Sequence, residues 1–179
     1  MKLGNPKEVI HDAYAIGLLS APQENYGTII DRSPASSANN TICNYLEAGR
    51  IVDVVESAEL FVKYWLKCAY APDDNNTVNL ASHLGDELFR KYFQTEKEKR
   101  HPKLRRLSKM AVLDYKMRVN NGNPLTQVFM SSSIGVGDNH YVDGGWFERV
   151  KRAQVELARL DMIGLEAVRV EIRKLRYGE

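Results

Sequence analysis

Apolar side chains recur at intervals of three and four residues through most of the chain after residue 50, which is the spacing of one face of an α-helix. Residues 52–71 follow this spacing and stop at Pro72, which cannot continue a helix. After the polar run DDNNT, with Thr77 as the expected N-cap, a second helix is predicted over residues 78–93. The apolar face of this helix carries Leu80, Leu84, Leu88 and Tyr92.

Two more helices are predicted in the second half of the chain. Residues 103–119 form one of them, because Pro102 suits a first helical turn and the run NNGNP suits a helix end. The other runs from Trp146 to the end of the chain. Its apolar stripe consists of Trp146, Val150, Ala153, Leu157 and Leu160 and, after a jog at residues 161–164, of Leu165, Val168, Ile172 and Leu175.

We interpret this stripe as a packing seam against the preceding helices. The alternative is a two-chain coiled coil, which the stripe supports over only about two heptads before the jog. In the first 50 residues, short helices are expected within 13–21 and 39–50, the second ending at Gly49, with a loop over 25–37. No segment alternates apolar and polar residues as a strand does. The predicted fold is mainly α, a multi-helix bundle with a long terminal helix.

The composition is that of a folded globular protein, with 44% hydrophobic and 27% charged residues. No run of 18 apolar residues occurs, and Glu8, His11 and Asp12 interrupt the region where a signal peptide is apolar. We therefore expect neither secretion nor membrane insertion. Cys43 and Cys68 lie in separate apolar stretches without the spacing of a metal or redox pair, so we expect reduced cysteines and a cytoplasmic location.

The net charge of +2 conceals a strong segregation along the chain. Residues 1–89 hold 6 Lys or Arg against 12 Asp or Glu, whereas residues 90–118 hold 11 against 3. Residues 119–179 are balanced, with 8 of each sign. A dense basic block creates a local positive potential, so we expect a polyanion as partner of this part of the chain.

The basic block supplies a set of candidate phosphate contacts. Within it, Lys103, Arg106 and Lys109 share one face of the predicted helix. The alternative is an ordinary solvated helix face. The candidate cations are Lys97, Lys99, Arg100, Lys103, Arg105, Arg106 and Lys109, together with Arg149, Lys151 and Arg152 after Trp146.

Residues 125–145 predict a helix-turn-helix, in which a second, recognition helix contacts base edges in DNA. Ile134, Gly135 and Val136 form the expected turn, and the second helix would begin with Asp138, Asn139, His140 and Tyr141. Asn and His can pair with base edges, and Asp can accept from cytosine. Gly144–Gly145 would end this helix after barely two turns, and a plain surface loop is the alternative. We thus expect a helical DNA-binding domain over residues 51–179 after a poorly specified segment 1–50.

Catalytic signatures are scarce. The histidines form no metal-binding motif, GVGDNH lacks the third glycine of a dinucleotide loop, and neither a P-loop nor GxSxG occurs. We therefore expect no enzyme, no metal and no cofactor. The alternative is a metal-dependent nuclease that uses Asp73, Asp74, Asp86 and Glu87.

Several stretches together resemble bacteriophage Q-type transcription antitermination proteins, over roughly residues 60–170. The shared features are an aromatic-rich helix ending near Tyr–x–Pro, a basic middle, a small–x–x–Gly–Val turn and a closing Trp helix. The stretches are VKYWLKCAYAPDD, ASHLGDELFRKYF, KLRRLSKMAVLDYKMRVNNGNP, SSSIGV and WFERVKRAQVELARLDMIGLEAVR. Some members of the family carry a cysteine zinc site, which this chain lacks.

The resemblance implies an all-helical protein that binds double-stranded DNA at a phage late promoter. Such a protein joins a paused bacterial RNA polymerase holoenzyme and lets it transcribe through terminators, in the cytoplasm of the host. By position, SSSIGVGDNHY would be the DNA-reading helix-turn-helix. The runner-up is a helix-turn-helix regulator or phage packaging protein that binds DNA without polymerase. A third possibility is a protein–protein adaptor that dimerises through the C-terminal stripe, and the sequence leaves the oligomeric state and the DNA target open.

Overall fold

The computed structural model describes the backbone of residues 4–20, 35–72 and 74–178. Residues 25–34 of the predicted loop, Asp73 and the side chains of Cys43 and Asp74 lie outside the described residues. Residues 35–37 were predicted as part of that loop but form the start of a helix. The elements are helices throughout, with no strand in the described ranges, so the prediction of a mainly α fold is confirmed. They are α1 (Pro6–Ser20), α2 (Ala35–Glu56), α3 (Leu60–Tyr70), α4 (Asp74–Tyr92), the 3₁₀ turn η1 (Glu98–Arg100), α5 (His101–Asn121), α6 (Gln127–Ile134), α7 (Asp138–Asp143) and α8 (Trp146–Tyr177).

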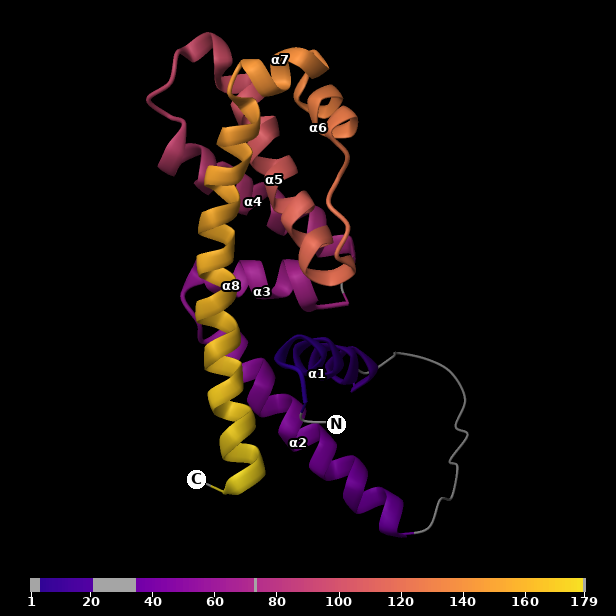
Figure 1. Cartoon of the computed structure of the whole chain (residues 1–179). Coiled ribbons are helices and arrows are strands. Elements are labelled where there is room, and N and C mark those ends of the chain that lie inside the picture. Colours follow the sequence, from indigo (N-terminus) through magenta and orange to yellow (C-terminus); the bar gives the residue numbers. More distant parts are fainter. Residues whose placement is uncertain (1–3, 21–34, 73, 179) are drawn as a thin grey trace.

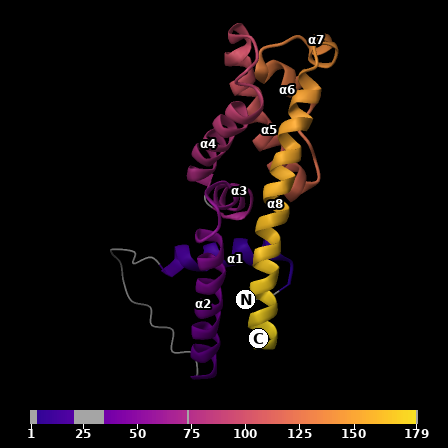
Figure 2. The same ribbon diagram turned by 90° about the vertical axis from the view of Figure 1, so that its left-hand side faces the viewer.

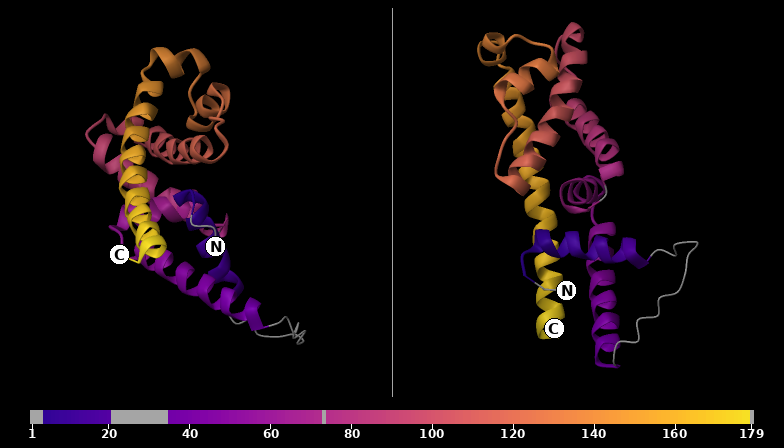
Figure 3. Two further views of the ribbon diagram at one scale, coloured as in Figure 1. Left: turned by 60° about the horizontal axis from the view of Figure 1, so that its bottom comes forward. Right: turned by 90° about the vertical axis from the view of Figure 1, so that its right-hand side faces the viewer.

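Helix α8 runs along the length of the molecule, and the other helices pack on one side of it (Figure 1). At one end, drawn at the bottom of Figures 1 and 2, α1 and α2 pack against its C-terminal half. Helix α3 crosses its middle. At the other end lie α4, α5 and the short helices α6 and α7, and the two views of Figure 3 show the same division.

The apolar stripe of α8 is a packing seam within one chain, as predicted. Its side chains are buried from Trp146 to Ile172, and they face α2, α3 and α5. Helix α8 is continuous through residues 161–164, as predicted, and Gly164 is the buried residue at the jog in the apolar spacing. Gly164 receives the side chain of Leu66, whose Cδ1 would lie only 2.7 Å from a Cβ on the glycine. The seam is therefore closest to α3 at the position that lacks a side chain.

A polar contact adjoins this close approach. Asp161 accepts hydrogen bonds on Oδ1 from Nε1 of Trp65 at 2.8 Å and from the hydroxyl of Tyr70 at 2.6 Å. Both aromatic side chains belong to α3 and are buried. A buried donor without a partner is costly, so this carboxylate fixes how α3 crosses α8.

The structure corrects two predictions around α2 and α3. Gly49 does not end a helix, since α2 continues to Glu56 and crosses the predicted domain boundary at residues 50–51. The helix predicted over 52–71 is two helices, α2 and α3, separated at residues 57–59. The apolar spacing did not indicate this break between the helices, because Val55 before it and Val62 after it both face the core.

The second predicted helix begins earlier than expected. Thr77 lies inside α4, which starts at Asp74, so its assignment as N-cap is wrong. The threonine is buried, and its Oγ1 accepts a hydrogen bond from Lys116 at 3.2 Å. Its carbonyl lies 3.9 Å from Sγ of Cys68, a free thiol whose pKa burial raises to about 11.

In contrast, Pro102 lies in the first turn of α5 and Gly122 ends that helix at φ 71°, both as predicted.

Gly164→Ala is expected to destabilise the protein, although alanine normally favours a helix over glycine. The added methyl group would overlap Leu66 in the core, where neighbouring side chains leave it no room to move, at a cost of about 1–3 kcal/mol. The matched control is Gly49→Ala in α2, where nothing lies within 4 Å of the new Cβ and a gain of about 0.5–1 kcal/mol is expected. Urea denaturation of both variants measures the difference, and equal changes at the two sites would contradict this account.

Candidate nucleic-acid interface

The basic tract and the predicted helix-turn-helix segment lie at the same end of the molecule. Figure 1 shows α6 and α7 beside the first turns of α5 and the start of α8. The guanidinium of Arg106 in α5 reaches the turn after α6, where Nη1 lies 3.3 Å from the position of a Cβ on Gly135. Arg149 near the start of α8 binds Glu96, which precedes η1. We call this region the basic end.

Many of the predicted cations at the basic end have no carboxylate partner among the described residues. Most of these side chains are exposed, and Lys103 and Lys109 are half-buried. The aliphatic part of Lys109 packs on Gly85 of α4, where the two helices meet closely. The cations without an ion pair are Lys97, Lys99, Lys103, Arg106, Lys109 and Arg152.

Other predicted cations are paired, which lowers their availability to a polyanion. Arg105 lies 3.3 Å from Asp86, and its guanidinium stacks on the ring of Phe89 with 4.3 Å to the ring centroid. Arg100 pairs with Glu96 at 3.3 Å, and Lys151 pairs with Glu148 at 3.2 Å. These are exposed pairs of modest strength, so a phosphate group can compete for the same cations.

Arg149 is a structural residue. Its Nε and Nη2 donate to the two carboxylate oxygens of Glu96 at 2.7 and 2.9 Å, and Nη1 donates to the carbonyls of Gly144 and Gly145. This guanidinium lowers the pKa of Glu96 below its usual value. The side chain is thus committed to joining the segment before η1 to the start of α8, although its charge still adds to the local potential.

The turn between α6 and α7 is held by local hydrogen bonds. Thr126 caps α6, its hydroxyl accepting from the amide of Phe129 at 3.3 Å. Gly135 ends the helix at φ 80°, a left-handed conformation that favours glycine, and its amide donates to the carbonyls of Ser131 and Ser132. The hydroxyl of Ser131 also donates to the carboxylate of Asp138, and this contact joins the two helices.

The four residues predicted to face DNA bases therefore differ in their surroundings. Tyr141 is a correction: its side chain is only 3% exposed, burial raises its pKa to about 12, and it packs near Phe147. A core residue of this kind cannot contact a base edge. Asp138 is exposed but bound to Ser131, whereas Asn139 and His140 are exposed, with the imidazole beside Trp146.

Helix α7 is short. It ends at Asp143, and Gly145 adopts φ 71° before α8 begins, so the Gly144–Gly145 pair does limit the helix after Gly135. A helix of 6 residues presents only its first turn and a half to a partner.

Asp114 is a buried residue of this region that the sequence analysis missed. It accepts hydrogen bonds from the amide of Leu125 at 2.6 Å, from Nε of Arg118 at 2.9 Å and from Nε2 of Gln154 at 2.5 Å. These contacts hold the segment before α6 against α5 and α8. A signal was present, because Asp114 is the only acidic residue between Glu98 and Asp138.

Candidate metal sites do not occur in the described parts of the chain, where no three His, Cys, Asp or Glu side chains cluster. Asp86 and Glu87, two of the acids considered for a nuclease, pair with Arg105 and Arg90 respectively. The described helices also include none that is long and apolar enough to cross a membrane.

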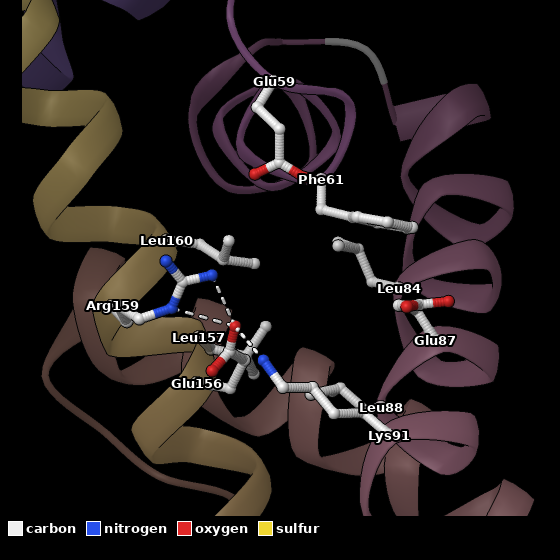
Figure 4. A pocket seen from close by; sticks show the side chains of 10 residues that line it. All are labelled: Glu59, Phe61, Leu84, Glu87, Leu88, Lys91, Glu156, Leu157, Arg159 and Leu160. Carbon is white, nitrogen blue, oxygen red and sulfur yellow. Dashed lines mark hydrogen bonds and ion pairs between the residues drawn. The ribbon is translucent and has the colours of Figure 1, made fainter.

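A cavity of about 300 Å³ lies between α3, α4 and α8 (Figure 4). Its floor is apolar, with Leu84 and Leu160 among the lining residues. Glu156 at its edge binds Arg159 at 2.7 Å and Lys91 at 2.9 Å, which lowers the pKa of the carboxyl group to about 2. These three residues form one ion-pair network at the edge of the cavity, and its lining residues include no nucleophile beside a base.

No protein-family model matches this chain, and no curated protein or solved structure matches it significantly.

Arg149→Ala is expected to lower the free energy of unfolding by about 1–3 kcal/mol, because it removes charge-assisted hydrogen bonds between α8 and the segment before η1. Arg152→Ala, which removes the same charge one turn later from an exposed side chain, is expected to change stability by less than about 0.5 kcal/mol. Thermal and urea denaturation compare the two variants. A loss at Arg152 as large as that at Arg149 would show that charge alone, and not the bidentate contact, is responsible.

Proposed function

We propose that this protein binds double-stranded DNA through its basic end. The observation that carries the proposal is the gathering of Lys97, Lys99, Lys103, Arg106 and Arg152 at one end, without carboxylate partners in the described structure. Solvated helix faces usually alternate cations with acids that pair with them, as the C-terminal part of α8 does through Glu166. Unpaired cations at one end create a positive potential that favours a dense polyanion.

In this proposal the cations neutralise phosphates, and the α6–α7 segment acts as a helix-turn-helix. Arg106 beside Gly135 would bind the backbone next to the turn, which sets the orientation of α7 on the duplex. Asn139 and His140 in the first turn of α7 are exposed and would reach base edges. Asp138 has a different role, since its carboxylate holds α7 to α6.

Lys103→Ala combined with Arg106→Ala is expected to weaken binding to duplex DNA roughly tenfold at low salt and to reduce the slope of log K against log salt by about 1.8, as two lost phosphate contacts require. These residues test the interface better than Arg105, which also stabilises the contact with α4. The control is Lys174→Ala with Arg176→Ala, an equal change of charge near the far end of α8. Equal effects of the two double variants would show that net charge, not the basic end, governs binding.

We further propose, from the resemblance to Q-type antitermination proteins, that the DNA-bound protein joins RNA polymerase holoenzyme and allows transcription through terminators. It would act in the cytoplasm of a bacterial host. The alternative is a helix-turn-helix regulator or packaging protein that binds DNA and leaves polymerase alone.

Capture of purified bacterial RNA polymerase holoenzyme by the immobilised protein separates these functions. Antitermination predicts a stable complex in the presence of sigma factor, and it predicts that Lys103→Ala with Arg106→Ala retains this complex while losing DNA affinity. A protein that shifts DNA but captures no polymerase is a regulator or packaging protein. The second step is run-off transcription past a terminator downstream of the late promoter, with and without the protein.

A further inference from the structure

The outer face of α8 carries apolar side chains that no described element covers. The seam of the helix faces the core, but Val155, Met162, Ile163 and Val170 on the opposite side are 70%, 64%, 42% and 40% exposed. At 3.6 residues per turn, these positions fall within one sector of the helix about 100° wide. In Figure 1, α8 crosses in front of α2 and α3, and in Figure 2 its lower part lies along one edge of the molecule. The face is therefore accessible to another helix.

We propose that α8 pairs in antiparallel orientation with α8 of a second copy of this chain, about a two-fold axis between residues 162 and 163. In this register Met162 faces Ile163 of the second copy, and Val155 faces Val170. The two-fold axis repeats each contact, as in other isologous interfaces. All four exposed apolar side chains then meet apolar partners and lose their contact with water.

Charge selects the same register. Arg159 lies between these apolar positions and faces Glu166 of the second copy, again twice. Glu166 also pairs with Arg169 and Arg173 of its own helix at 3.1 and 2.8 Å. These exposed pairs are of modest strength, so Arg159 of the second copy can compete for the carboxylate. Within its own chain, the guanidinium of Arg159 donates hydrogen bonds from Nε and Nη2 to Glu156, at 3.0 and 2.7 Å. Its Nη1 remains to bind a carboxylate across the interface. A parallel pair would place Arg159 against Arg159 and Glu166 against Glu166. Like charges in apposition disfavour that arrangement.

The paired segment has clear limits. Beyond Val155 and Val170 the next facing positions are Arg152 and Arg173, which repel each other, so the contact covers residues 155–170, about 24 Å of helix. An interface of this length is small, and the dimer forms and dissociates with protein concentration. The proposal is separate from DNA binding, because residues 155–170 include none of the cations proposed to contact DNA.

Sedimentation equilibrium of the full chain over a concentration series tests the proposal. The wild-type mass is expected to rise from that of one chain to that of two. Val155→Glu with Val170→Glu places like charges opposite each other twice, and a single-chain mass is expected at every concentration. Val155→Lys with Val170→Glu places opposite charges together in the antiparallel register, and this variant is expected to dimerise.

The two double variants change the same exposed positions and differ only in the charge at residue 155. Circular dichroism and thermal denaturation confirm that both remain folded. A wild-type mass of one chain throughout, or the same mass for both variants, overturns the proposal. No DNA is present, so a failure here leaves the DNA-binding proposal standing.

Discussion

The close approach of α3 to the middle of α8 is the contact on which the rest of this structure depends. Gly164 leaves room for Leu66, and Asp161 one turn away accepts hydrogen bonds from Trp65 and Tyr70. The apolar contact brings the helices together and the carboxylate fixes their angle, since two buried donors need its oxygen. With its middle fixed in this way, α8 supports α1 and α2 on one side of the crossing and α4 to α7 on the other.

Side chains of α8 hold the elements of the basic end in place. Arg149 binds Glu96 and two backbone carbonyls, and Gln154 reaches Asp114, which in turn holds the segment before α6. Each of these polar side chains is satisfied within the chain, so each one positions neighbouring elements. The cations without an ion pair in the described structure lie around this scaffold, just before and on η1, on α5 and on α8. The positions of these cations are the basis of the proposed contact with DNA.

The helical regions were predictable from the sequence, and their ends were less so. Pro102 and Gly122 mark the limits of α5 because each residue acts through its own backbone angle. Gly49 and Thr77 failed as markers because a glycine is tolerated within a helix and a threonine within a helix can be held by a distant lysine. The break at residues 57–59 depends on packing against other helices, which apolar spacing does not report.

The same distinction applies to the candidate site. By itself the sequence determined that the chain is helical and that cations are concentrated in residues 90–118, and it favoured a core seam over a coiled coil for the stripe of α8. Only the tertiary structure decided that Tyr141 is a core residue, that Arg149 is bound to Glu96, and that Arg106 lies beside the turn at Gly135. The physical reason is that periodicity and charge counts are local properties of the chain. Burial and ion pairing depend on residues that are distant in sequence and meet only after folding.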